Sequence, residues 1–123
     1  MRILVDTHIF LWMLASPEKF SETRRYELES STNELYLSAI SVAELMIKHS
    51  IKKIKVNFDL MEMANKIGLE ILSFSGEEAM VLKELPFHHK DPFDRMLIAQ
   101  SLTNKLILMS DDSKFQLYDC KTI

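Results

Sequence analysis

Four acidic side chains that are far apart in the sequence stand where a parallel sheet would bring them together. Asp6 directly follows a short apolar run, and Asp112 follows a second such run after Ser110 and Asp111. Glu44 and Asp94 fall in the expected first turns of helices that follow strands. Because right-handed crossovers bring the carboxyl ends of parallel strands to one edge of the sheet, we expect the four carboxylates to converge there.

Such a convergence of carboxylates predicts a particular chemistry. Partly buried carboxylates repel one another, so a group of them without nearby basic partners needs a cation. Oxygen ligands without cysteine or a clear histidine pair favour Mg²⁺ or Mn²⁺ over zinc. One such ion lowers the pKa of a bound water, and a second, about 3.5 to 4 Å away, stabilises the leaving oxygen. The pattern therefore predicts metal-dependent hydrolysis of phosphodiester bonds.

Each acid also has a purely structural interpretation as a helix cap or as a charge near a helix N-terminus. Asp6 could cap a helix starting near residue 8, Glu44 could complete a capping box with Ser41, and Asp112 could cap the segment around residue 115. Two acids, however, lie on apolar helix stripes and are expected to face inward. Glu44 shares its stripe with Ile40, Ile47 and Ile51. Asp94 heads a stripe with Leu97, Ile98 and Ser101.

The elements that must position these residues alternate between strand and helix. Strands are expected at residues 2–5, 35–37, 70–73 and 105–109, with a weaker fifth edge strand at 118–123. Helices are expected at residues 8–15, 17–29, 42–51, 58–67, 76–85 and 92–103. This alternation predicts one three-layer α/β/α domain over residues 1–123, with a mostly parallel central sheet of four or five strands.

Composition narrows the class of protein further. The 123 residues carry a formal net charge of -3 with a pI near 5.8, so any nucleic-acid contact must be local. A single cysteine, Cys120, excludes a disulfide within the chain. The longest uncharged apolar run, residues 9–15, is too short to span a bilayer. We therefore expect a cytoplasmic protein with no membrane association.

Four motifs occur in order along nearly the whole chain. They are ILVDTH at 3–8, SVAE at 41–44, HHKDPFDRMLIAQ at 88–100 and SDDSKF at 110–115. Together they resemble the PIN-domain family, specifically its VapC-like toxins of type II toxin–antitoxin systems. The resemblance implies an endoribonuclease that uses Mg²⁺ or Mn²⁺, cleaves an RNA substrate, pairs with a cognate antitoxin protein and forms a homodimer.

The resemblance also implies roles for particular residues. It gives the catalytic, metal-binding acids as Asp6, Glu44, Asp94 and Asp112. It gives as supporting residues Thr7 and Ser110 at small hydroxyl positions and Asp91 as a helix cap beside the metal. Asp111, which departs from the family pattern and makes the site more negative, is a further supporting candidate. Relatives often carry a basic or neutral residue where this chain has Asp111, which leaves open whether Asp111 or Asp112 faces the metal. The spacing of Asp112 to Phe115 fits the family pattern better.

Possible RNA contacts are Lys48, His88, His89 and Lys90. Lys48 stands on the same helix as Glu44, and the other three precede the acidic helix at residue 92. The competing interpretations are an exposed ion pair between Lys48 and Glu44, a solvated helix face, and an ordinary polar loop.

Two other functions remain as alternatives. The first is a receiver-type phosphoacceptor signalling domain, which has similar length and an acidic Mg²⁺ pocket. That class requires paired acids after the first strand and a lysine after the fifth, and neither is found here. The second is a PIN-fold binding module without activity, which would be expected to have lost at least one of the four acids.

Overall fold

In a computed structural model that describes residues 1–123, four parallel strands form a single sheet. In chain order they are β1 (Arg2–Val5), β2 (Glu34–Ser38), β3 (Leu69–Leu72) and β4 (Ile107–Met109). Their order across the sheet is β3-β2-β1-β4, and every pairing is parallel. All four carboxyl ends therefore lie at one edge of the sheet, as the alternation of strands and helices predicts.

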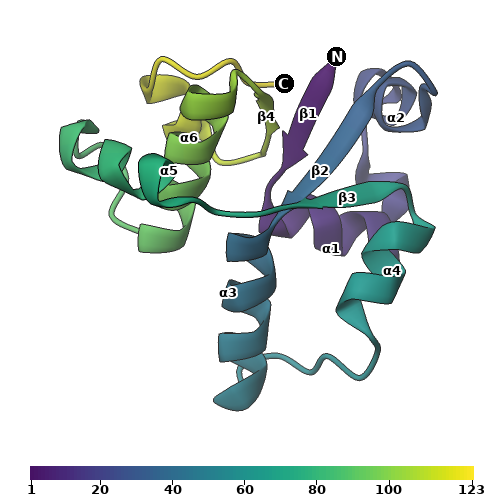
Figure 1. The fold of residues 1–123 in the computed structure, drawn as a ribbon. Helices are drawn as coiled ribbons and strands as arrows, with labels where there is room; N and C mark the ends of the chain where they lie inside the picture. The colour runs from purple at the N-terminus through teal and green to yellow at the C-terminus, as the bar shows by residue number, and fades with distance from the viewer.

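Six α-helices and three short 3-10 helices surround this sheet. The α-helices are α1 (Thr7–Ala15), α2 (Glu22–Glu29), α3 (Ala39–Ser50), α4 (Leu60–Lys66), α5 (Gly76–Val81) and α6 (Pro92–Asn104). The 3-10 helices are η1 (Pro17–Lys19), η2 (Leu82–Glu84) and η3 (Ser113–Leu117). Figure 1 shows α5 and α6 on one side of the sheet, while α1, α2 and α4 lie toward the other.

The alternation of side chains along β1 divides the core into two layers. Ile3 and Val5 belong to a buried cluster that includes Ile9 and Phe10 of α1. Leu4, between them, belongs to a second cluster with Leu97, Ile98, Leu106, Leu108 and Phe115. Since both faces of the sheet are covered by helices, the fold is the predicted three-layer α/β/α domain.

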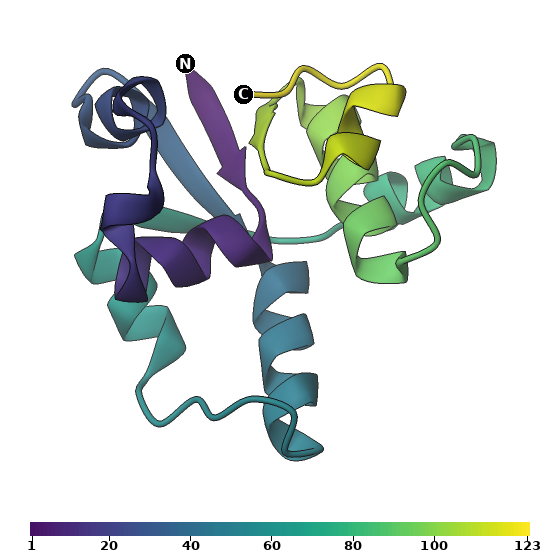
Figure 2. The same ribbon diagram turned by 180° about the vertical axis from the view of Figure 1, so that it is seen from behind.

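The register of the strands places the residues that follow β1, β2 and β4 close together. Val5 pairs with Leu37 on one side and with Met109 on the other. The next residues along these three strands, Asp6, Ser38 and Ser110, therefore lie side by side at this edge of the sheet. Figure 2 shows α1 and α3 starting at this edge, close to the start of α6.

The helix before the second strand differs from its predicted course. The expected helix at 17–29 is two pieces, because Ser21 interrupts it and caps α2 by accepting a hydrogen bond from the backbone N–H of Arg24 at 3.2 Å. The helix expected to begin at residue 42 begins at Ala39, since Ser38 at the end of β2 caps it and accepts from Ile40 N–H at 3.0 Å. Glu44 consequently lies in the second turn of α3.

Several elements in the second half of the chain differ from their predicted bounds. Lys105 has a left-handed φ of 54° that ends α6, so β4 starts only at Ile107. The expected fifth strand at 118–123 is reduced to one parallel bridge between Leu108 and Thr122. The helix expected at 76–85 continues beyond Val81 as η2. No helix in the fold is both long and apolar enough to cross a membrane.

Candidate active site

A cleft of about 340 Å³ opens at the carboxyl edge of the sheet. Its lining residues are Asp6, Thr7, His8, Trp12, Glu44, Lys48, Asp91, Asp94, Asp111 and Asp112. All four predicted catalytic acids are among them, as are three of the four predicted supporting residues. The convergence expected from strand topology is therefore present in the folded chain.

Asp6 both caps a helix and faces the cleft. It follows β1, is only 6% exposed, and its Oδ1 accepts a hydrogen bond from Ile9 N–H at 2.8 Å. Burial raises the pKa of Asp6 above its usual value, while hydrogen bonds from Ser110 and Ile9 oppose the rise. Ser110 also accepts the backbone N–H of Asp112 at 3.0 Å, so this small hydroxyl lies between two of the acids.

Glu44 is held by polar partners on both of its carboxylate oxygens. The hydroxyl of Thr7 donates to Oε1 at 2.8 Å, and the ammonium group of Lys48 donates to Oε2 at 2.7 Å. Thr7 Oγ1 also lies 2.9 Å from Ser41 Oγ, deep in the fold. The bond to Glu44 raises the pKa of Lys48, so this lysine is charged and paired inside the cleft.

The predicted surroundings of Glu44 need a correction. Glu44 is 6% exposed, as its expected inward direction requires, but Ile47 and Ile51 are 48% and 57% exposed. Because α3 starts three residues early, Ser41 lies inside the helix, and the capping box proposed for Ser41 and Glu44 does not form. Hydroxyl and ammonium groups, rather than an isoleucine stripe, surround this carboxylate.

Asp91 and Asp94 divide capping and site roles at the start of α6. Asp91 is the cap, and its Oδ1 accepts from Phe93 N–H at 2.9 Å and Asp94 N–H at 3.4 Å. Burial, and then the neighbouring charge of Asp91, raise the pKa of Asp94 to about 7, while His89 opposes the rise. The buried position therefore disfavours the ionised form of this carboxyl group.

The neighbouring residues Asp111 and Asp112 have different partners. Asp111 forms an ion pair with Arg24 of α2, whose guanidinium also donates to the carbonyl oxygen of Ser110 at 2.7 Å. Asp112 caps η3 by accepting Lys114 N–H at 2.9 Å. Burial acts to raise the pKa of Asp112, but the hydrogen bonds from Lys114 and His89 together hold it below its usual value. Geometry therefore places Asp112, rather than Asp111, beside Asp94.

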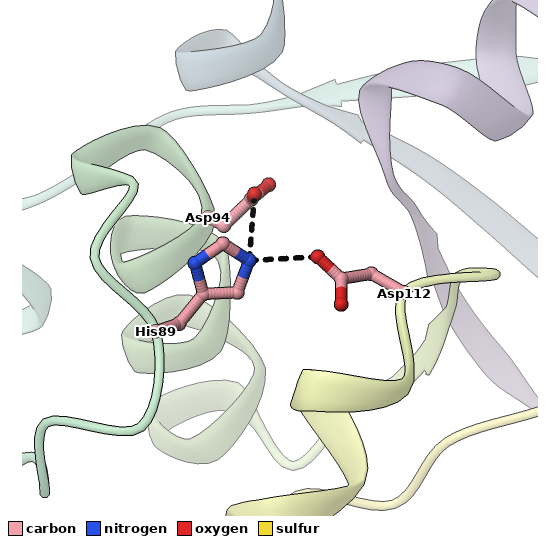
Figure 3. A group of neighbouring side chains, drawn as sticks. All are labelled: His89, Asp94 and Asp112. Atoms are coloured by element: carbon pink, nitrogen blue, oxygen red, sulfur yellow. Dashed lines mark hydrogen bonds and ion pairs between the residues drawn. The ribbon is translucent and has the colours of Figure 1, made fainter.

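His89 joins Asp94 to Asp112 and was not predicted in this position. Its Nε2 lies 2.7 Å from Asp112 Oδ2 and 3.1 Å from Asp94 Oδ2, as Figure 3 shows. The histidine is 7% exposed, so it lies inside the fold rather than on an open RNA-binding surface. The sequence signals for His89 and Arg24 were weak: His89 stands two residues before a helix cap, and Arg24 is one of several charged residues on α2.

The remaining predicted RNA contacts lie in different places. Lys48 lines the cleft, where it pairs with Glu44. His88 and Lys90 are exposed and are not among the cleft-lining residues.

The donor set of the cleft fits a hard divalent cation. Six carboxylates line it, against a single lysine. Ligand atoms of His89, Asp94 and Asp112 all lie within 4.8 Å of one another, a spacing that one ion could span. Burial raises the pKa of both Asp6 and Asp94, so a cation in the cleft would favour their ionised forms. Oxygen-rich sites of this kind suit Mg²⁺ or Mn²⁺.

Comparison with known proteins agrees with this architecture. The chain is similar to VapBC2 from Rickettsia felis bound to a promoter DNA fragment, with 19% identity, a TM-score of 0.71, and coverage of 100% of this chain and 98% of the other. It is also similar to DNA-bound VapBC from Salmonella typhimurium, with 16% identity, a TM-score of 0.69, and coverage of 100% of this chain and 97% of the other. A third similar structure is VapBC-1 from nontypeable Haemophilus influenzae, with 17% identity, a TM-score of 0.66, and coverage of 100% of this chain and 97% of the other. No curated protein matches the sequence.

A family model matches nearly the whole chain. The PIN domain model matches residues 3–120, which include all four acids of the cleft and every strand beyond the first residue of β1. This match confirms the PIN-domain resemblance drawn from the four motifs, and the fold is like that of chains in VapBC structures. The chain belongs to the PIN domain family.

Proposed function

We propose that this protein is a metal-dependent endoribonuclease that hydrolyses RNA phosphodiester bonds, with Mg²⁺ or Mn²⁺ held by Asp6, Glu44, Asp94 and Asp112. One observation carries the proposal: four acids from four separate segments line a single cleft at the carboxyl edge of a parallel sheet. Membership of the PIN domain family supports a nuclease over a receiver-type phosphoacceptor domain.

The chain's own residues would hold this site in a fixed arrangement. Thr7 and Lys48 restrain Glu44, and the cap at Asp91 sets the first turn of α6 that carries Asp94. Ser110 lies against both Asp6 and Asp112. A bound divalent ion would supply a water of lowered pKa and positive charge beside the phosphate.

Contacts to RNA would be local, because the chain has a net charge of -3. Lys48 is the lysine that lines the cleft, and its ammonium group lies 2.7 Å from Glu44 Oε2. His88 and Lys90, exposed on the loop before α6, are the further candidates for contacts to phosphate.

The biological assignment follows the family resemblance. We propose that the protein is the toxin of a toxin–antitoxin pair, with a cognate antitoxin as its protein partner, and that it acts in the cytoplasm. The likeness of the fold to chains in VapBC structures supports this assignment. A homodimer is also proposed, because Met46, Ile47 and Ile51 leave apolar surface exposed on α3.

Cleavage of a mixed cellular RNA pool tests the activity. Purified protein is incubated with the pool in Mg²⁺, in Mn²⁺ and in chelator, and Asp94→Asn serves as the inactive variant. Asp119→Asn is the matched control, since Asp119 is exposed and does not line the cleft. Metal-dependent products from the wild type and Asp119→Asn, absent from Asp94→Asn, are expected.

Two other results have defined meanings. Equal cleavage by Asp94→Asn would indicate a contaminating nuclease. No cleavage, together with no Mn²⁺ binding by calorimetry, would contradict the proposal and favour a PIN-fold binding module without activity. Phosphorylation by a small phosphodonor, detected as a mass increase, would instead favour the receiver-type alternative.

A further inference from the structure

His89 is a buried imidazole that joins two acids from distant segments. Its side chain is 8% exposed, and Nε2 lies 2.7 Å from Asp112 Oδ2 and 3.1 Å from Asp94 Oδ2. Asp94 belongs to the first turn of α6, whereas Asp112 lies between β4 and η3. Figure 3 shows the ring between the two carboxylates.

The hydrogen bond at Nδ1 shows which ring nitrogen of His89 carries the proton. Nδ1 of His89 accepts the backbone N–H of Asp91 at 3.2 Å. A backbone N–H can only donate, so Nδ1 holds no proton, and the neutral ring carries its proton on Nε2. The proton on Nε2 is therefore donated to Asp112 Oδ2 at 2.7 Å, and Asp94 Oδ2 lies 3.1 Å from the same nitrogen.

This tautomer is that of a hydrogen-bond donor and not of a metal ligand. A metal ion binds the unprotonated nitrogen of imidazole. For Nε2 to bind an ion, its proton would have to move to Nδ1, where it would face the N–H of Asp91. Although His89, Asp94 and Asp112 are spaced closely enough to hold one ion, the bond from Asp91 opposes that arrangement.

The surrounding structure fixes the position of the ring. The backbone N–H groups of His88 and His89 both donate to the hydroxyl of Tyr118, at 3.1 and 2.8 Å. The imidazole also packs against Phe115, with 5.7 Å between ring centroids. Phe115 and Tyr118 belong to the segment that Asp112 opens, so the ring and Asp112 are held by the same part of the chain.

We infer that His89 is a positioning residue: its Nε2–H, donated to Asp112 and lying against Asp94, holds the two acids side by side at the cleft. This inference rests on the proposed function only in that the two acids bind metal. The partial positive charge of this N–H lies beside both acids, and it offsets the repulsion between them before an ion arrives. Outer partners of metal ligands typically change metal affinity by about 10- to 100-fold when they are removed.

The tautomer is tested directly by long-range ¹H–¹⁵N NMR of protein labelled at histidine nitrogens. The His89 signals are assigned by their loss in His89→Gln. Without metal, we expect Nε2 to be protonated and Nδ1 to be unprotonated, and the same pattern after Mg²⁺ is added. A switch to a proton on Nδ1 in Mg²⁺ would make His89 a ligand and overturn the inference, as would a mixture of tautomers without metal.

Metal affinity separates positioning from simple structural support. By calorimetry with Mn²⁺, His89→Leu is expected to bind about 10- to 100-fold more weakly than wild type. His89→Gln, whose amide N–H can donate from a similar place, should recover part of that loss. Asp119→Asn, exposed and outside the cleft, serves as the control with unchanged affinity. Wild-type affinity in His89→Leu would overturn the inference.

The outcome also distinguishes this inference from the proposed nuclease function. If the wild type binds Mn²⁺ but cleaves no RNA, the nuclease proposal fails while the affinity series still tests His89. If His89→Leu does not fold, as judged by circular dichroism, the NMR experiment on wild-type protein still decides, because its assignment needs only the conservative His89→Gln variant.

Discussion

Several acids of the cleft serve local structure and the site with the same side chain. Asp6 and Asp112 each cap a helix, yet both line the cleft. A carboxylate has two oxygens with about four lone-pair positions, so one bond to a backbone N–H leaves others free. The capping and functional interpretations of these residues are therefore compatible.

Replacing Asp94 by Asn is expected to stabilise the metal-free protein at pH 8. The pKa of Asp94 is about 7 in the folded state, against 3.8 as its ordinary value. Between these values the folded state binds more protons than the unfolded state, so the wild type loses stability as pH rises from about 4 to 7. Asn does not titrate, and the expected gain above pH 7 is about 1 to 3 kcal/mol.

Urea unfolding in chelator at pH 8 and at pH 5 measures this effect. The advantage of Asp94→Asn should shrink at pH 5, where the wild-type carboxyl is largely protonated in the fold. Asp119→Asn, at an exposed position, should show no such difference. A variant less stable than wild type at both pH values would mean that Asp94 mainly stabilises the start of α6.

At the scale of elements, the cap of α6 is the local feature that orients Asp94. Asp91→Ala is expected to lower the free energy of unfolding by about 1 kcal/mol, because two backbone N–H groups lose their acceptor. Asp91→Asn keeps an oxygen in the same place and should retain most of that stability. The midpoints of urea unfolding compare the two, and equal losses would argue against a capping role.

The Arg24 side chain connects helix α2 to the loop that follows β4. Arg24 pairs with Asp111 and donates to the carbonyl oxygens of Ser110 and Ile123, at 2.7 and 3.1 Å. Arg24→Ala is therefore expected to cost about 2 kcal/mol of unfolding free energy. Arg25→Ala is the control, since Arg25 is exposed on the same helix. Equal urea midpoints for the two variants would contradict this role for Arg24.

At the scale of the whole molecule, the exposed apolar surface of α3 bears on assembly. Met46, Ile47 and Ile51 are 39%, 48% and 57% exposed, and α3 extends away from the sheet in Figure 1. The double variant Ile47→Glu and Ile51→Glu is expected to be monomeric in sedimentation experiments in which the wild type is a dimer. Burying charge at such a contact is unfavourable.

Tyr26→Glu provides the comparison for this experiment, because Tyr26 is 69% exposed on α2 and should leave the dimer intact. A monomeric wild type would refute the proposed homodimer. A dimer that survives the double variant would place the contact on another surface of the fold.

The sequence by itself determined the fold class and the convergence of the four acids. Both follow from local rules: apolar runs predict buried strands, capping residues and prolines predict helix starts, and parallel topology brings carboxyl ends to one edge. Asp6, Glu44, Asp94 and Asp112 could therefore be placed in one cleft before any coordinates were known. The start of α3 was missed by three residues, because Ser38 ends β2 and caps the helix at once.

Only the tertiary structure decided which side chains meet across long sequence separations. Arg24 pairs with Asp111, which is 87 residues away in the sequence, whereas Asp112 contacts His89, which is 23 residues away. No pattern of spacing encodes such pairings, because they depend on how α2, α6 and the loop after β4 pack. The exposure of Ile47 is of the same kind: its helix stripe is apolar in sequence, but α3 extends past the sheet, and no neighbouring element in the folded chain buries it.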